Sequence, residues 1–277
     1  MSTQSRRRNG RASVRRLLEM KAEGQRIVAM TAYDVLFARL LEEAGVDLIL
    51  VGDSLGQVVL GYDSTIPVTL DEMIHHARAV KRGAPDTLVV LDMPFMSYQA
   101  STEDALRNAG RALKEAGVEA VKLEGGHRRT CEAIEALVAA GIPVMGHIGL
   151  TPQSVHALGG YRVQGRSQAD ADRIRSEARA LEEAGVFAMV LELVPAKLAR
   201  EISQSLTVPT VGIGAGPGCD GQVLVLYDAL GLNPSFGPRF LKKFAQLHQS
   251  ALDGVKEYAA EVRGGSYPGP EHSFDGD

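Results

Sequence analysis

Cysteine is scarce in this sequence, and long apolar runs are absent. The two cysteines, Cys131 and Cys219, lie far apart and form no CxxC pair. This spacing argues against a disulfide-stapled secreted scaffold and favours a reduced, cytoplasmic protein. No apolar run approaches the roughly 18 residues that a helix needs to cross a bilayer. We therefore expect no membrane span.

A strong charge of either sign is also lacking. The formal net charge of −4 gives no global attraction to nucleic acid or to a membrane surface. Residues 1–16 contain six arginines and no acid, and they lack the apolar core of a secretory signal. We expect a disordered basic extension over residues 1–12, with an organellar transit peptide as the alternative. Residues 264–277 are rich in glycine and proline and predict an irregular tail over a surface or a neighbouring chain.

The sequence does contain eight short apolar segments, which alternate with longer segments of helical period. Several are apolar almost throughout, which is typical of strands buried on both faces of a parallel sheet. With 45% hydrophobic residues, the chain can build a sizeable core. The eight predicted strands are residues 26–31, 47–52, 87–93, 119–124, 142–148, 187–193, 209–215 and 221–228.

Helices with recognisable ends lie between the predicted strands. Thr69 and Ser101 stand as N-caps of helices predicted over 69–83 and 101–117, and a third helix is predicted over 170–185. A glycine at a helix end supplies a left-handed cap before the chain enters the next strand. The tripeptide Ala-Gly-Val stands at three such helix ends, at residues 44–46, 116–118 and 184–186.

These repeated units indicate the fold. Eight units of about 35 residues each have the size expected of a (β/α)8 barrel. We therefore predict an α/β fold, a single-domain (β/α)8 TIM barrel over residues 13–263, with the basic extension before it and the irregular tail after it. A doubly wound open sheet is the alternative, but eight near-regular units favour closure. No linker divides the chain.

Four acids stand where predicted strands end: Asp53, Asp92, Glu124 and Glu192, separated by 39, 32 and 68 residues. These steps correspond to one, one and two units of the barrel. The carboxyl ends of the strands are where the active sites of such barrels are built. Four carboxylates around one mouth would repel one another, so we expect positive charge among them.

An acid after a strand is often only the cap of the next helix, and Asp53 in the sequence Gly-Asp-Ser could serve that purpose. Asp92 is harder to explain in this way, because Pro94 follows and no helix begins there. Lys122 and Glu124 are two residues apart on one predicted strand and therefore share a face. Both point into the barrel or both point out; a lysine inside needs a negatively charged partner.

Oxygen ligands of this kind favour a hard cation such as Mg²⁺. Zinc is a poor match, because His75 and His76 are adjacent on a predicted helix and do not share a face. His147, at the end of the segment 142–148, is a better histidine for the mouth, either in direct contact with a ligand or behind the groups that make that contact.

The glycine-rich segment 212–221 formally contains G-x-G-x-x-G. A phosphate loop is nevertheless not favoured, because the segment that follows predicts a strand rather than a helix. Residues 201–238 also contain no lysine or arginine. We expect a wide turn that lets a flat ligand or a neighbouring backbone approach.

Eight motifs in order give the chain a family resemblance, from about Ser13 to the segment Pro-Gly-Pro-Glu-His-Ser-Phe ending at residue 274. Each motif alone is weak, but the ordered set is specific, and it resembles the ketopantoate hydroxymethyltransferases (3-methyl-2-oxobutanoate hydroxymethyltransferases). The motifs are TAYD (31–34), VGDSLG (51–56), GYDST (61–65), DMPF (92–95), VKLEGG (121–126), GHIGLTPQSV (146–155), LELVP (191–195) and GIGAGPGCDGQVLV (212–225).

The resemblance implies a Mg²⁺-dependent (β/α)8 enzyme of pantothenate and coenzyme A biosynthesis. Such enzymes transfer a one-carbon unit from 5,10-methylenetetrahydrofolate to 3-methyl-2-oxobutanoate through a Mg²⁺-stabilised enolate, giving 2-dehydropantoate. The resemblance also implies a cytoplasmic homodecamer. No nucleic acid or membrane partner is expected.

The site residues follow from the same resemblance. Asp53, Asp92 and Glu124 would hold the metal, directly or through water. Asp53, Ser54, Asp92 and Lys122 would bind the oxo acid, and Glu192 would be the catalytic base. Every one of these positions carries the residue that the family pattern expects.

Two other functions are compatible with parts of the sequence. A Mg²⁺-enolate lyase or mutase of the phosphoenolpyruvate mutase/isocitrate lyase type would have similar acids but usually a reactive cysteine loop, and Cys131 lies instead in a helical pattern. A non-catalytic scaffold would use the arginine-rich tail to contact nucleic acid. Folate dependence of turnover separates the first alternative, and deletion of residues 1–12 separates the second.

Overall fold

The structure is a computed structural model that describes residues 13–274 of the 277. The basic extension expected at residues 1–12 lies outside the described residues, as do the last three residues. The chain divides into two compact units, the first ending at Val225 and the second beginning at Leu226.

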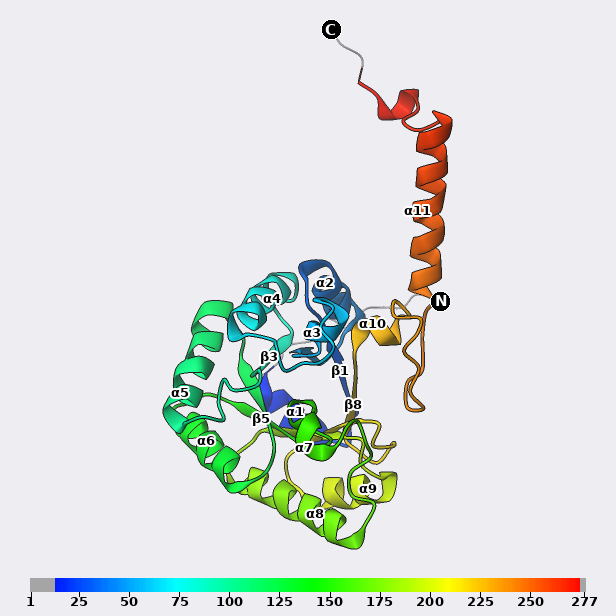
Figure 1. The fold of residues 1–277 in the computed structure, drawn as a ribbon. Coiled ribbons are helices and arrows are strands. Elements are labelled where there is room, and N and C mark those ends of the chain that lie inside the picture. The colour runs from blue at the N-terminus through cyan, green and yellow to red at the C-terminus, as the bar shows by residue number, and fades with distance from the viewer. Residues whose placement is uncertain (1–12, 275–277) are drawn as a thin grey trace. The chain divides into compact units, whose positions relative to one another are not determined.

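Eight parallel strands of the first unit close into a barrel in chain order, β1 to β8 (Figure 1). Each apolar segment singled out in the sequence overlaps one of these strands, although β5 runs one residue beyond its predicted segment, to Gly149. The predicted (β/α)8 barrel is therefore confirmed and the open sheet is excluded. The strands are β1 Ile27–Thr31, β2 Leu48–Val51, β3 Leu88–Asp92, β4 Ala120–Glu124, β5 Val144–Gly149, β6 Ala188–Glu192, β7 Thr210–Ile213 and β8 Gly221–Leu224.

Helices surround these strands (Figure 1). The predicted N-caps Thr69 and Ser101 are confirmed, since each side chain accepts a hydrogen bond from the first turn of its helix. The helical elements of this unit are α1 Val14–Ala22, α2 Val35–Ala44, α3 Leu55–Val58, α4 Leu70–Gly83, α5 Thr102–Arg111, the π-helical turn η1 Ala112–Ala116, α6 Arg128–Ala139, the 3₁₀ turn η2 Pro152–Ser154, α7 Val155–Leu158, α8 Gln168–Glu183 and α9 Ala196–Ser205.

The repeated Ala-Gly-Val tripeptide ends helices as predicted. Gly45, Gly117 and Gly185 have φ angles of 77°, 74° and 93°. These left-handed values let the chain reverse out of a helix and enter the next strand at the same end of the barrel each time.

The glutamates just before two of these turns form hydrogen bonds that join neighbouring βα repeats of the barrel. Oε2 of Glu42 accepts hydrogen bonds from the backbone nitrogens of Asp86 and Thr87, both at 2.9 Å, as the chain approaches β3. Oε1 of Glu182 accepts from the backbone nitrogens of Thr207 and Val208 at 2.6 and 3.2 Å, ahead of β7. These bonds satisfy backbone donors at the N-terminal end of the barrel.

A buried apolar cluster fills part of the interior of the barrel. Leu48 and Leu50 share one face of β2 and lie in a single buried cluster with Leu88 of β3. Leu17 and Met20 of α1 belong to the same cluster, so α1 closes the N-terminal end. The open end of the barrel is therefore the one formed by the carboxyl ends of the strands.

The second unit contains the short helix α10 Leu226–Ala229, the helix α11 Leu247–Gly264 and the 3₁₀ turn η3 Pro270–His272. The sequence analysis extended the barrel domain to residue 263, whereas the last barrel strand ends at Leu224; the extent of the catalytic domain stays a prediction. No helix in residues 13–274 is long and apolar enough to span a membrane.

Candidate active site

The barrel brings the four predicted acids to one rim. Asp92, Glu124 and Glu192 are the last residues of β3, β4 and β6, and Asp53 follows β2 by two residues. The pairing of neighbouring strands puts Lys122 beside Asp92. It also puts His147 beside Glu124. Residues that are about one βα repeat apart in the sequence therefore lie next to each other at the mouth of the barrel.

Lys122 points into this mouth, which decides between the two directions that the sequence left open. Its Nζ atom lies 2.6 Å from Oδ1 of Asp92 and 3.7 Å from Oε1 of Glu124. Burial disfavours the charged ammonium, but the acids Asp92, Glu124 and Asp53 outweigh it and raise the pKa of Lys122. The lysine is thus a fixed positive charge among the acids.

Asp53 and Asp92 are two buried carboxyl groups whose negative charges are disfavoured by their surroundings. Both are buried, and the backbone nitrogen of Asp53 lies 3.4 Å from Oδ2 of Asp92. Burial and the neighbouring carboxylates of Asp92 and Glu124 raise the pKa of Asp53 well above its ordinary value. Burial is also the main cause of the raised pKa of Asp92, although Lys122 opposes it. Lys122 and the nearby His147 are fewer than the four acids, Asp53, Asp92, Glu124 and Glu192, so the site has capacity for a further positive charge.

His147 lies between the other two acids. Its Nδ1 atom is 3.2 Å from Oε1 of Glu124, and its Nε2 atom is 3.3 Å from Oε2 of Glu192. Burial disfavours the imidazolium, but the two carboxylates outweigh this and raise the pKa of His147 to about 9. The same imidazole, with Lys122, holds the pKa of Glu124 below its ordinary value despite burial. His147 therefore connects Glu124 to Glu192.

Glu192 is the acid most open to the mouth, with 20% of its side chain exposed. The residue after it, Leu193, has a φ of 46°, a left-handed value that is uncommon without glycine. Its backbone nitrogen donates to Ile213 and its carbonyl accepts from Gln164, both at 2.9 Å. These bonds fix the sharp turn that ends β6 at the carboxylate.

Ser54 lies next to Asp53 at the start of α3. Its hydroxyl makes no capping bond to that helix; instead Oγ lies 2.9 Å from the hydroxyl oxygen of Tyr33. Asp53 is not the cap either, because its carboxylate is bonded to the amide of Gln153. The helix-cap explanation that the sequence allowed for this segment is therefore wrong.

Two residues of the cluster were missed by the sequence analysis, Gln153 and Tyr98. Gln153 bonds to both Asp53 and Glu124, and the hydroxyl of Tyr98 lies 3.0 Å from Oε1 of Gln153. Gln153 falls in a motif that carried the family resemblance, whereas Tyr98 lies in none of those motifs. A glutamine has no characteristic catalytic spacing that would have separated it from its neighbours.

The chemistry of the donors fits Mg²⁺ better than a softer metal. The acids supply only oxygen, and Oε1 of Glu124 is buried without a hydrogen-bond partner. Within residues 13–274, no group of three His, Cys, Asp or Glu side chains is arranged to hold a metal by itself. The protein carboxylates alone therefore do not form a complete shell, and water and substrate oxygens would have to supply the remaining ligands of a Mg²⁺ ion.

The histidines excluded from a zinc site lie elsewhere, as expected. His75 is exposed on α4. Nδ1 of His76 lies 2.7 Å from the carbonyl oxygen of Tyr33. Neither residue contacts the acids at the mouth.

The glycine-rich segment forms the turn between β7 and β8, so the predicted strand after it is confirmed. A Cβ atom at Gly216 would lie 2.4 Å from Cβ of Ala196, which begins α9. Close approach of a neighbouring element therefore explains this glycine, as the wide-turn hypothesis required.

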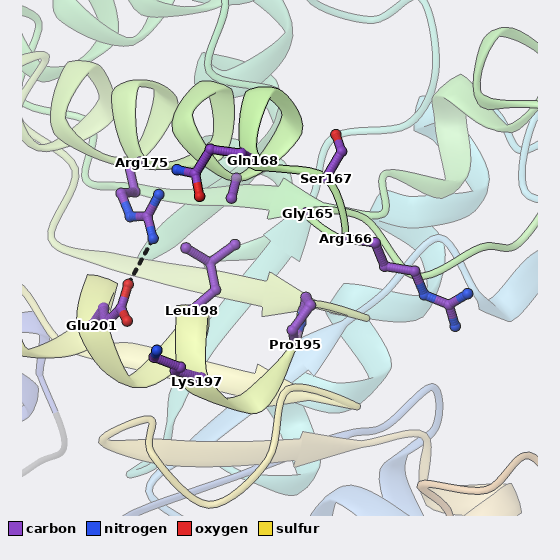
Figure 2. A pocket seen from close by; sticks show the side chains of 10 residues that line it. Gly165, Arg166, Ser167, Gln168, Arg175, Pro195, Lys197, Leu198 and Glu201 are labelled. Atoms are coloured by element: carbon purple, nitrogen blue, oxygen red, sulfur yellow. Dashed lines mark hydrogen bonds and ion pairs between the residues drawn. The ribbon is translucent and has the colours of Figure 1, made fainter.

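A hollow of about 220 Å³ lies between the N-terminal parts of α8 and α9 (Figure 2). Arg175 points across it toward Glu201, and their side chains form an ion pair at 2.7 Å. Arg166, Lys197 and Leu198 are among the other residues that line the hollow. None of the predicted site residues lines this hollow.

Solved structures share the fold. A phosphonopyruvate hydrolase described in complex with oxalate and Mg++ aligns with a TM-score of 0.61 at 16% identity, covering 94% of this chain and 92% of that one. A 2,3-dimethylmalate lyase of the PEP mutase/isocitrate lyase superfamily aligns with a TM-score of 0.60 at 22% identity, covering 94% and 87%. At these identities the likeness concerns the barrel alone.

Sequence relatives are far more similar. Proteins named 3-methyl-2-oxobutanoate hydroxymethyltransferase are 59% identical in Heliobacterium modesticaldum, over 92% of both chains, and 58% identical in Moorella thermoacetica, over 95% of this chain and 98% of that one. The relative of that name in Syntrophus aciditrophicus is 56% identical over 99% of this chain and its own full length. The model of the ketopantoate hydroxymethyltransferase family matches residues 11–270. The chain therefore belongs to the ketopantoate hydroxymethyltransferase family.

Proposed function

We propose that this transferase moves a hydroxymethyl unit from 5,10-methylenetetrahydrofolate to 3-methyl-2-oxobutanoate, giving 2-dehydropantoate, as the first step of pantothenate biosynthesis. The observation that carries the proposal is the buried cluster of Asp53, Asp92, Lys122 and Glu124 at the barrel mouth. The name shared by relatives at 56–59% identity supports the substrate.

The oxo acid enters a site whose charges are already arranged. Lys122 offsets the negative charge of the substrate carboxylate, and the hydroxyl of Ser54, the residue after Asp53, donates to a substrate oxygen. Asp53, Asp92 and Glu124 would hold Mg²⁺, directly or through water. When bound, Mg²⁺ supplies a Lewis acid that stabilises the negative charge developing on the keto oxygen.

Glu192 is the base that removes the proton from C3 of the substrate. It is the most exposed of the four acids, which suits a group that must reach a substrate carbon. His147, 3.3 Å from Oε2 of Glu192, orients that carboxylate from behind. C3 then forms a bond to the methylene carbon of the folate, and the bonds from that carbon to the two folate nitrogens break. One water molecule supplies the hydroxyl oxygen of the product, and tetrahydrofolate is released.

The exposed apolar residues of the second unit support a proposal about the assembly. No residue of α11 is buried within the chain, and its apolar residues Leu252, Val255, Tyr258 and Val262 recur at helical spacing on an exposed face. A lone helix with such a face is stabilised by packing against another chain. A cytoplasmic homo-oligomer, a decamer as in the family, is the assembly we propose.

Deuterium exchange tests the chemistry without the folate. The purified protein is mixed with 3-methyl-2-oxobutanoate in D₂O, with and without Mg²⁺, and loss of the C3 proton signal is followed by NMR. We expect exchange that requires both protein and Mg²⁺. Absence of exchange in the presence of Mg²⁺, from a preparation that is folded, would overturn the proposed mechanism.

Solved lyases and mutases share the fold, but this sequence has no equivalent of the reactive cysteine loop expected of that alternative. Cys131 is buried in α6, and burial raises the pKa of its thiol, which keeps it protonated and unreactive. Turnover that depends on methylenetetrahydrofolate separates the two reactions, since a lyase or mutase needs no folate.

A further inference from the structure

Gln153 has no part in the proposed chemistry, although it lies at the centre of the acid cluster. It belongs to the 3₁₀ turn η2 after β5, and only 4% of its surface is exposed. A polar side chain buried to this extent is expected to satisfy all its hydrogen-bonding groups. The hydrogen-bond partners of Gln153 therefore indicate the role of its side chain.

The donors of Gln153 hold two acids that come from different strands. Its Nε2 atom donates to Oδ2 of Asp53 at 3.0 Å and to the carbonyl of Met93 at 2.9 Å. Its backbone nitrogen donates to Oε2 of Glu124 at 3.1 Å. One residue thus fixes one oxygen of Asp53 and one oxygen of Glu124.

The acceptor side fixes which way the amide points. Oε1 of Gln153 accepts from the hydroxyl of Tyr98 and from Nε2 of Gln99, both at 3.0 Å. The Tyr98 oxygen in turn accepts from the backbone nitrogen of Glu124 at 3.0 Å. Its single hydrogen has two acceptors within reach, Oε1 of Gln153 at 3.0 Å and the carbonyl oxygen of Glu124 at 3.3 Å, and the shorter distance favours Gln153. The amide cannot flip without losing these bonds, and its NH₂ group remains aimed at Asp53.

This arrangement leaves the second oxygen of each carboxylate outside the bonds to Gln153. Oε1 of Glu124 is buried and has no hydrogen-bond partner. This oxygen instead faces two cationic side chains, with Nζ of Lys122 at 3.7 Å and Nδ1 of His147 at 3.2 Å. A carboxylate with one oxygen fixed by a donor and the other turned toward positive charge is oriented to accept a cation. We propose that Gln153 is a positioning residue that holds Asp53 and Glu124 in the geometry needed to bind the divalent cation, a role that rests on the proposed function.

Replacement of Gln153 by Met and by Glu tests this role. Met keeps the volume but removes both side-chain donors, and Glu keeps the shape but turns an acid toward Asp53. We expect the dissociation constant for MgCl₂, measured by calorimetry, to rise about 10- to 100-fold for Gln153→Met. We expect a larger rise for Gln153→Glu. Turnover of Gln153→Met should recover in part at high Mg²⁺, whereas a purely structural role would leave the Mg²⁺ affinity of the folded protein unchanged.

Gln168→Met is the matched control, because Gln168 is exposed on α8 and bonds only to Asp172 on the same helix. Its Mg²⁺ affinity should equal that of the unaltered protein. If Gln153→Met does not fold, Tyr98→Phe removes the hydroxyl that fixes the amide and that also accepts from the backbone nitrogen of Glu124. A several-fold loss of Mg²⁺ affinity is expected. Unchanged affinity in the folded Gln153 or Tyr98 variant overturns the positioning role alone. Failure of the unaltered protein to bind Mg²⁺ instead overturns the metal-dependent function.

Discussion

Nζ of Lys122 lies 2.6 Å from Oδ1 of Asp92, and each side chain is at least 96% buried. This pair forms between adjacent strands whose register places the two residues side by side. A buried ion pair contributes little net stability, because both charges must be removed from water. Its main consequence is that loss of either partner leaves an uncompensated charge in the barrel.

Lys122→Met should therefore destabilise the protein by about 3–5 kcal/mol in urea unfolding without Mg²⁺ and should abolish turnover. Added Mg²⁺ should stabilise this variant more than the unaltered protein, because the cation replaces part of the missing charge. Lys197→Met, on the exposed surface of α9, should change stability by less than about 0.5 kcal/mol. Equal stability of Lys122→Met and the unaltered protein would contradict the charge balance described here.

Glu192→Gln should separate binding from proton removal. The amide keeps the size of the side chain and leaves the acids around Asp53 untouched, so binding of 3-methyl-2-oxobutanoate should change little. The amide is not a base, so exchange of the C3 proton with D₂O should fall to the level seen without protein. NMR measures the exchange, and calorimetry measures the binding. Exchange at the original rate would remove Glu192 from its role.

Glu182→Ala should lower stability without affecting turnover. The carboxylate accepts three hydrogen bonds at the end of the barrel opposite the mouth, so its loss should cost about 1–3 kcal/mol. The exposed neighbour Glu183 is the control, and Glu183→Ala should change stability by less than about 0.5 kcal/mol. A loss of turnover at saturating substrate, in folded Glu182→Ala, would count against a purely structural role.

The effect of Glu182→Ala should also depend on pH. Burial favours the protonated acid, but the bonds from Thr207 and Val208 outweigh it and hold the pKa of Glu182 below its ordinary 4.5. A carboxyl with a lowered folded-state pKa contributes stability that is complete above its unfolded pKa and disappears as pH falls through the folded value. The stability difference between Glu182→Ala and the unaltered protein should therefore be full at pH 7 and shrink below about pH 4.5. A difference that grows on acidification would contradict the assignment.

The exposed face of α11 should control assembly. Val255 and Tyr258 are 65% and 58% exposed in the single chain, and a glutamate at both positions would place charge where another chain should pack. We expect light scattering to give a smaller particle for Val255→Glu/Tyr258→Glu. Lys256→Glu, which changes charge beside this face rather than on it, should keep the original mass. An unchanged mass for the double variant would exclude this face from the interface.

Much of the fold was predictable because each strand is a short apolar run between helix signals. The helix predicted over 101–117 was less regular than expected: α5 ends at Arg111 and a π-helical turn follows over Ala112–Ala116. Alanine, leucine, lysine and glutamate all favour an ordinary helix, so their composition carries no sign of the wider turn.

The candidate site was predictable only as far as strand ends determine it. Asp92, Lys122 and Glu124 could be placed together because parallel strands end at the same rim. Gln153 could not, because it reaches Asp53 across 100 residues of sequence through a loop whose path no local pattern specifies. The double contact of His147 likewise depends on side-chain directions at two different strand ends.

The bonds from Glu42 and Glu182 have one further consequence. They join successive βα repeats at the N-terminal end of the barrel, which is the end opposite the loops that carry Ser54, Gln153 and Leu193. The sequences of those loops can therefore change without breaking the hydrogen bonds of Glu42 and Glu182. An engineer who grafts foreign loops onto this scaffold should retain its resistance to unfolding while discarding its chemistry.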